Sequence, residues 1–220
     1  MKVRLLLGVA GALAAMPLLG SPAWSAACQM GSVGSYIALD GTGCNVGPVE
    51  FSNIQVSVTT SGGGSVTLGN FTPFISGNEF GLALNYTALA PVAGATADIA
   101  WTYNVSGVGG VLLNDALLAL AGNTTGAGQA QVSEILSNGV TLSLNAPGST
   151  SVTFAPVSSL FVLKDQIDFV GPAGGTSTTS ILTNAFSPVP GPLAGAGLPG
   201  LIAACGGLLG LARRRRRQMA

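Results

Sequence analysis

Side chains able to do chemistry are few in this chain of 220 residues, which contains no histidine. The missing imidazole excludes Ser-His-Asp and Cys-His catalysis and any histidine-bound metal. Glycoside hydrolysis needs two carboxylates held at a fixed separation, and no spacing in the sequence provides such a pair. We therefore expect the interior acids to be isolated, solvated surface charges, and these are Asp98, Asp115, Glu134, Asp165 and Asp168.

The sequence gives equally little support for a cofactor site or a metal site. Asp165 and Asp168 carry the oxygen ligands that calcium prefers, but no oxygen-rich loop of known spacing surrounds them. The glycine runs 62–64 and 107–110 are expected to be turns, because neither is followed by the Lys-Ser/Thr and helix of a phosphate-binding loop. The sequence predicts no catalytic residue, no cofactor and no metal, and a protein that is not an enzyme.

Two cysteines, Cys28 and Cys44, stand near the start of the interior, and Cys205 lies close to the other end. A cysteine pair in an exported domain is typical of a disulfide, which we favour over two free thiols. Closing a loop of about 15 residues would stabilise the fold by roughly 3 kcal/mol. Two thiols without histidine cannot fill a four-ligand zinc site.

The first residues have the three parts of a secretory signal peptide. Lys2 and Arg4 form a positive start, residues 5–19 are apolar, and small residues precede a cut by signal peptidase expected after Ala27. The alternatives are an uncleaved anchor and a lipoprotein lipidated on Cys28, in which Ser25 would stand where a lipobox has leucine.

Nearly all basic residues lie at the two ends of the chain. Between the ends remain Lys164 and eight acids, a net charge of about −7. An exported domain with this charge is expected to stay soluble and to bind no nucleic acid.

Short runs of β-branched and apolar residues fill the interior, with turn residues every 8–12 positions or so. This pattern predicts an all-β fold, a single β-sandwich domain over residues 28–187, with a solenoid as the alternative. The expected strands cover 36–39, 51–60, 66–75, 80–86, 98–105, 111–121, 131–136, 140–144, 152–156, 160–163, 167–170 and 181–186.

Some segments carry more specific expectations. Residues 98–105 alternate strictly and place Trp101 on the apolar face, and Asn138-Gly139 predicts a hairpin. Residues 111–121 also fit a helical stripe, but their strand-like neighbours favour a strand. Residues 171–179 are expected to be a flexible link.

The end of the chain combines a proline-rich break, an apolar segment and a basic stop. The prolines between 188 and 192 favour an extended, exposed stretch. Residues 193–211, kinked at Pro199, are near the lower limit for a short transmembrane helix. The arginines that follow would hold the end on the cytoplasmic side, and they are Arg213, Arg214, Arg215, Arg216 and Arg217. A buried helix or a nucleic-acid-binding tail accounts for these parts less well.

This arrangement resembles the PEP-CTERM sorting signal of Gram-negative bacteria, in which a Pro-x-Pro-type motif precedes a short transmembrane helix and an arginine-rich end. The motif here is Val189, Pro190, Gly191 and Pro192, with Gly191 in place of the usual glutamate. The resemblance implies recognition by an exosortase, a membrane enzyme that cuts near the motif and passes the protein to the cell surface. The interior also resembles domains on such cargo, between Cys28 and Asn53 and between Lys164 and Phe186, which supports the Cys28–Cys44 pairing.

Our first hypothesis is an exported protein of the cell surface or extracellular matrix, which passes through the inner membrane and has a structural or adhesive role within exopolysaccharide. The alternative is a secreted carbohydrate-binding module or glycan-active enzyme that uses the same sorting route. A binding module needs a row of exposed aromatic residues and an enzyme needs converging carboxylates, so neither is favoured. A third hypothesis, a membrane-resident protein, differs only in keeping its tail helix.

Overall fold

The computed structural model describes residues 25–190, and nearly all of them belong to β-strands, as the sequence predicts. The tail helix, the arginine cluster and most of the signal peptide lie outside this range. The elements are β1 (Gly31–Ser32), α1 (Val33–Ile37), η1 (Asp40–Thr42), β2 (Cys44–Val46), β3 (Val49–Ser61), β4 (Ser65–Ser76), β5 (Glu79–Ala90), β6 (Thr96–Gly107), η2 (Val108–Gly110), β7 (Val111–Leu136), β8 (Thr141–Leu144), β9 (Gly148–Val157) and β10 (Ser159–Pro190).

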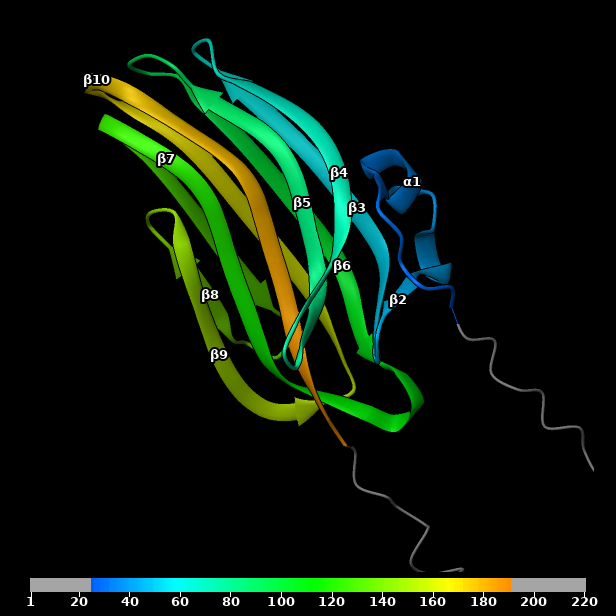
Figure 1. The fold of residues 1–220 in the computed structure, drawn as a ribbon. Helices are drawn as coiled ribbons and strands as arrows, with labels where there is room; N and C mark the ends of the chain where they lie inside the picture. The colour runs from blue at the N-terminus through cyan, green and yellow to red at the C-terminus, as the bar shows by residue number, and fades with distance from the viewer. Residues whose placement is uncertain (1–24, 191–220) are drawn as a thin grey trace, which may run out of the picture.

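The ten strands form one antiparallel sheet that curls until its two halves face each other. Layer A contains β2, β3, β6 and β8 with the first half of β10, and layer B contains β1, β4, β5 and β9 with its second half. The strand β7 stays paired with β10 through both layers. Figure 1 shows the sheet folded in this way, with both long strands passing from one layer to the other. The result is consistent with the predicted β-sandwich.

Aromatic side chains hold the two layers together. The ring of Phe71 from layer B lies 5.0 Å from Trp101 of layer A, and Phe51 of layer A lies 6.4 Å from Phe186 of layer B. These rings are fully buried, and tilted pairs at such distances add roughly 0.5–1.5 kcal/mol each beyond their buried area. The alternation along residues 98–105 is confirmed, since Trp101 points inward and its neighbours point outward.

The corner between the layers consists of glycine-rich backbone. The two long strands bend where β10 has a register shift between Val170 and Gly175. Gly126 (φ +58°) and Gly174 (φ +76°) adopt left-handed conformations there, which glycine does at no steric cost. The prediction of a flexible link over 171–179 was wrong, because residues 175–179 pair with Gly122–Gly126 of β7. The glycines serve a sharp bend in a continuous strand.

The prediction of a strand over 36–39 was also wrong. Residues Val33–Ile37 form a single helical turn, capped by the Ser32 hydroxyl, which accepts a hydrogen bond from the Ser35 N–H at 3.2 Å. The Tyr36 ring packs 4.9 Å from Phe71, and its hydroxyl donates to the Gln29 carbonyl. A side-chain cap and one anchoring ring therefore outweigh the strand propensity of Tyr36-Ile37.

Two other predictions, the hairpin at Asn138-Gly139 and a strand over residues 111–121, were confirmed. The Asn138-Gly139 hairpin joins β7 to β8, with Ile135 opposite Thr141, and residues 111–121 are strand. The prediction of separate strands over 160–163, 167–170 and 181–186 was wrong, because these residues belong to one strand, β10. No helix within residues 25–190 has the length and apolar composition needed to cross a membrane.

Candidate functional site

The disulfide between Cys28 and Cys44 is confirmed, with an S–S distance of 2.08 Å and a Cα separation of 4.9 Å. It ties the chain entering the fold to β2. The backbone reinforces this link, because the Cys28 N–H donates to the Asn45 carbonyl at 2.8 Å. The covalent link and the backbone hydrogen bond fix the same point of the fold.

The residues before Cys28 also contact the domain. Ala27 forms an isolated bridge with Asn45, and the Ser25 hydroxyl donates to the side chains of Asn45 and Glu50. The cut after Ala27 remains a prediction. It would remove the Ser25 contacts and leave Cys28 as the first residue, still held by Asn45.

The segment predicted to be a sorting motif begins inside the last strand, β10. Val189 and Pro190 pair with Leu112 and Val111 at the end of β7, and Asn78 donates to the Pro188 carbonyl at 3.3 Å. Beyond Phe186, β10 no longer pairs with β5, so one edge of β10 has no paired strand beside it there. Proline lacks an N–H and is tolerated on such an edge. Gly191, Pro192 and residues 213–217 lie outside the described range.

Two acids that were expected to be solvated are instead buried between the layers. Glu134 and Asp168 are fully buried, so the prediction of surface charges was wrong for both. Glu134 accepts a hydrogen bond from Lys164, the one basic residue within residues 25–190, and this pair is also fully buried. The Lys164 ammonium lies 5.7 Å from the centre of the Trp101 ring. Burial lowers the pKa of Lys164, and the Glu134 charge opposes that shift.

Asp168 is the centre of a second buried polar group. Its carboxylate accepts hydrogen bonds from Ser177, Thr179 at 2.6 Å and Gln166 at 3.1 Å. Burial nevertheless raises its pKa, because the loss of water outweighs these bonds. Asp165, three residues earlier, is exposed on the opposite face of β10. The idea of a calcium ion shared by Asp165 and Asp168 is therefore wrong, since the two side chains point to opposite sides of the sheet.

The outer surface of layer A offers the strongest candidate for binding. Phe161 is its exposed aromatic ring, with 47 % of the side chain accessible, the most exposed aromatic within residues 25–190. Ile135 (48 %) and Leu163 (37 %) lie beside it on β7 and β10, directly opposite one another. We call the surface formed by these three residues and the polar residues around them the Phe161 face.

Polar side chains surround the ring on the Phe161 face. Asn104 of β6 lies opposite Phe161, and Ser52 of β3 lies opposite Asn104. On the other side, Phe161 and Ser137 are joined through a backbone and a side-chain hydrogen bond. A hollow of about 330 Å³ is formed here by Asn104, Val105, Ser106, Ser137, Ser159, Leu160 and Phe161. One aromatic platform thus has amide and hydroxyl groups on both sides.

The charges near the Phe161 face are acidic. Asp98 of β6 and Asp165 of β10 lie on the same outer surface, on neighbouring strands. Burial raises the pKa of Asp98, and the nearby Asp165 carboxylate raises it further. The one basic side chain of the described range is buried inside the sandwich, so no positive side chain of that range lies on this surface.

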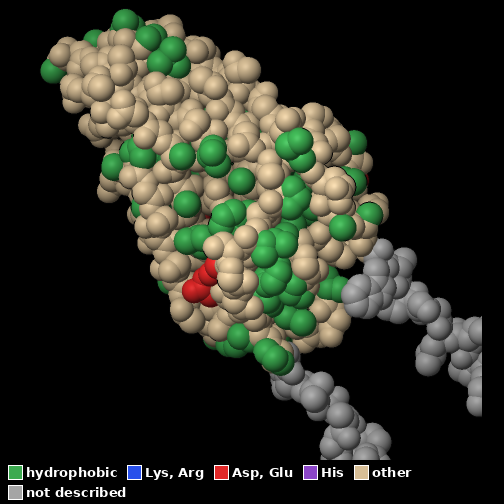
Figure 2. All heavy atoms as spheres, in the orientation of Figure 1, with side chains coloured by type: hydrophobic (Ala, Val, Ile, Leu, Met, Phe, Trp, Pro, Cys, Tyr) green, Lys and Arg blue, Asp and Glu red, His purple; other side chains and the backbone are tan. Residues whose placement is uncertain are grey.

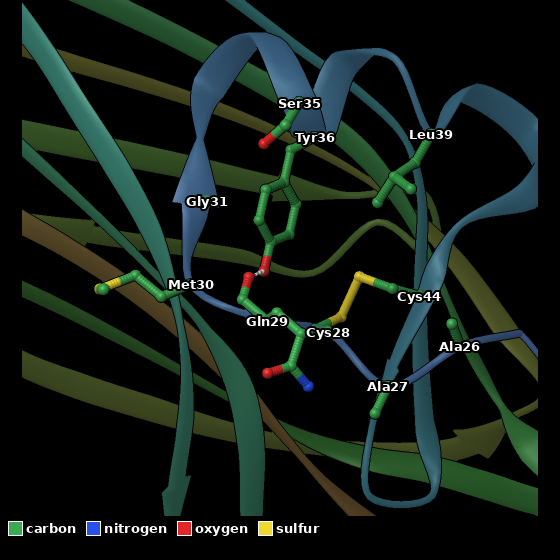
Figure 3. A pocket seen from close by; sticks show the side chains of 10 residues that line it. All are labelled: Ala26, Ala27, Cys28, Gln29, Met30, Gly31, Ser35, Tyr36, Leu39 and Cys44. Carbon is green, nitrogen blue, oxygen red and sulfur yellow. Dashed lines mark hydrogen bonds between the residues drawn. A yellow bond between two sulfur atoms is a disulfide. The ribbon is translucent and has the colours of Figure 1, made fainter.

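A second hollow lies beside the disulfide. It has a volume of about 230 Å³ and is lined by Ala26, Ala27, Cys28, Gln29, Met30, Gly31, Ser35, Tyr36, Leu39 and Cys44. Figure 3 shows the Tyr36 ring and the disulfide forming one wall, with the Tyr36 hydroxyl turned to the Gln29 backbone. Burial raises the pKa of Tyr36 to about 12, so its hydroxyl stays protonated. A cut after Ala27 would remove Ala26 and Ala27 from the lining of this hollow.

The rest of the surface is weakly charged. Figure 2 shows one face, on which apolar side chains gather over the lower part beside a small acidic spot and are isolated elsewhere, with no basic atoms visible on the described part. Trp101 is buried as predicted. The Phe161 face was missed at the sequence level because Phe161 stands in a run, Leu160-Phe161-Val162-Leu163, in which period-2 alternation cannot tell the inner from the outer face.

No protein-family model and no curated sequence matches this chain. Among solved structures, the chain is similar to TmCBM61 in complex with β-1,4-galactotriose, at 7 % identity, over 58 % of this chain and 86 % of that one, with a TM-score of 0.30. It is similar to the family 11 carbohydrate-binding module from Clostridium thermocellum in complex with a β-1,3-1,4-mixed-linked tetrasaccharide, at 8 % identity, over 59 % and 87 %, with a TM-score of 0.26.

A family two carbohydrate esterase from Cellvibrio japonicus is similar over 64 % of this chain and 36 % of that one, at 12 % identity and a TM-score of 0.24. At these scores no residue of this chain corresponds reliably to a binding or catalytic residue in the three structures. The candidate site is therefore defined by the contacts around Phe161 and not by the comparison.

Proposed function

We propose that this protein is an exported, non-enzymatic adhesin of the cell surface or extracellular matrix that contacts neutral polysaccharide through the Phe161 face. The observation that supports the proposal is the exposed Phe161 ring between Asn104 and Ser137 on the outer surface of layer A. The disulfide supports an oxidising, extracytoplasmic location.

The chemistry of the Phe161 face suits a sugar ring. The C–H face of a pyranose packs on an aromatic ring, while its hydroxyls exchange hydrogen bonds with amides and hydroxyls at the edge. Sites for small ligands commonly combine an apolar platform with a few polar groups that fix orientation. Because one ring provides the platform, each contact is weak, and firm attachment needs many copies acting together on one polymer.

The acidic side chains on the outer surface of layer A favour a neutral polysaccharide over an anionic one. Asp98 and Asp165 lie on the same outer surface, and the described range has one base, which is buried. An anionic polymer would approach a surface of its own sign, which lowers both the rate of encounter and the affinity. The proposal therefore names neutral polysaccharide.

The sorting route is the second part of the proposal. The chain would be cut after Ala27 by signal peptidase and near Val189-Pro190-Gly191-Pro192 by an exosortase. The position of Val189 and Pro190 on a half-free strand end, immediately after the last core residue Phe186, supports this route. A cut just beyond β10 would leave the sandwich complete.

The test is electrophoresis of the native protein in gels that contain soluble neutral polysaccharides, such as galactan or mixed-linkage β-glucan, with alginate as the anionic comparison. We expect a neutral polymer to retard the wild type and alginate to leave it unretarded. Phe161→Ala should weaken the retention up to about tenfold, since a stacked ring contributes roughly 0.5–1.5 kcal/mol.

Ile75→Ala is the matched control, because Ile75 is another exposed hydrophobic side chain (62 %), on β4 of layer B. It should bind as the wild type does. Equal retention of wild type and Phe161→Ala, or equal losses in both variants, would contradict a site at Phe161. Retardation by alginate alone would contradict the choice of a neutral ligand.

A further inference from the structure

Lys164 and Glu134 form an unusual pair for the interior of a sandwich. They lie directly opposite each other on β10 and β7, in register, with both side chains on the inner face. Neither side chain has any exposed surface. The amine contacts one carboxylate oxygen of Glu134, Oε2, and the Trp101 ring covers it at 5.7 Å.

If Lys164 and Glu134 form only an ion pair, burying them lowers the stability of the fold. The second carboxylate oxygen of Glu134, Oε1, is buried without a hydrogen-bond partner within the described residues. Removing each charge from water opposes folding, and the attraction between the two charges compensates for this only when the remaining donors and acceptors are also satisfied. The unpartnered oxygen means that this condition is not met.

We propose that Lys164 and Glu134 are joined by an intramolecular isopeptide bond between Nζ and the side-chain carbonyl carbon of Glu134. The register holds the amine against the carboxyl group, and such fixed orientation gives intramolecular reactions effective concentrations of about 10⁵–10⁸ M. The bond removes both charges and one of the two carboxyl oxygens. Burial also lowers the pKa of Lys164, so the amine reaches its neutral, nucleophilic form more easily.

The reaction needs no co-reactant. A proton passes from the ammonium to the carboxylate, and the neutral amine adds to the carboxyl carbon. The carbon–oxygen bond to one Glu134 oxygen then breaks, and that oxygen leaves as water with two protons that began on the amine. The product is one amide carrying a single N–H, and nothing is oxidised or reduced. In a dry core the water leaves for solvent, which opposes the reverse hydrolysis.

The sequence offers a direct test, because Lys164 is the one trypsin site within residues 25–190. The exported protein, whichever ends it has, is purified, reduced, alkylated, denatured and digested with trypsin. We expect no cleavage after Lys164 and an intact mass lower by one water, beyond the hydrogens lost at the disulfide. Cleavage after Lys164 together with the full mass would overturn the proposal, and a loss of ammonia would overturn the choice of Glu134.

Two variants keep the test decisive. Lys164→Arg keeps the charge and a trypsin site but cannot form this amide, so it should be cut and should have the full mass. If that variant folds poorly, the double variant Lys164→Met with Glu134→Leu replaces the pair by apolar side chains, an exchange that is often neutral for stability. It should be exported with no loss of water. A missing water in either variant would place the reaction elsewhere.

Discussion

Asp168 is a buried carboxyl group whose titration should make the stability of the fold depend on pH. Its pKa is raised by burial in the fold, whereas in the unfolded chain it is close to the ordinary value of about 4. The folded state therefore holds the proton to a higher pH than the unfolded state. The stability that this protonation provides is complete below the unfolded pKa and is lost as the pH rises through the folded pKa.

We therefore expect wild-type protein to be more stable near pH 4, at the unfolded pKa, than at pH 7, and Asp168→Asn to lose much of that difference. The amide of this variant keeps the shape of the carboxyl group but cannot titrate. The measurement is urea denaturation at both pH values. Glu79 and Asp98 also have raised pKa values and remain in both proteins, so a smaller dependence should persist. An unchanged pH dependence in the variant would mean that Asp168 is ionised throughout.

Single residues also show what the sequence could reveal. The inward position of Trp101 followed from strict alternation, because an antiparallel strand with one face in water repeats every two residues. The same alternation places Lys164, Gln166 and Asp168 inside, but their polarity suggested the opposite. Sequence reasoning treated charge as a mark of exposure, and the partners that make burial tolerable come from positions 2 to 30 residues away, most of them outside the local alternation.

Among the elements, the corner of β7 and β10 was the least predictable. A strand of 32 residues, β10, looks like several short strands because polar and glycine residues interrupt it. In a sheet that turns a corner, glycine permits the close approach of two backbones, and flexible links have the same composition. Local composition therefore predicted the strands on each side and could not reveal their continuity.

The corner glycines give a clear prediction. A methyl group on Gly128 would lie 1.9 Å from the Thr176 carbonyl oxygen, so Gly128→Ala must push two paired strands apart. We expect a loss of roughly 1–3 kcal/mol in unfolding free energy, the usual range for overpacking. Chemical denaturation followed by tryptophan fluorescence measures it.

Gly171→Ala is the control at the same corner. The added methyl would meet its nearest atom, the Cβ of Ala127, at 3.4 Å, and a change within about 0.5 kcal/mol is expected. A destabilisation equal to that of Gly128→Ala would mean that the backbone contact at Thr176 is not the cause.

At the scale of the whole molecule, both ends of the described range are connected to segments predicted to direct export. Intact mass of the protein from the cell surface and the medium tests both cuts together. We expect a species that begins at Cys28 and ends near Pro190. Such a species would lose the Ser25 contacts with Asn45 and Glu50 but keep the disulfide and all ten strands. A membrane-bound species that still carries Arg213–Arg217 would instead indicate a retained anchor.

The path of β10 has a mechanical consequence for a protein held at its tail. The strand runs from Ser159 to Pro190 through both layers, and the tail follows it directly. Tension applied through the tail therefore acts along the second half of β10, from Pro190 back to the bend between Val170 and Gly175. Because antiparallel hydrogen bonds lie perpendicular to the strands, such a pull loads many of them together in shear. Resistance to detachment would then depend first on the collective strength of the ladders that this half of β10 forms with β5 and β7.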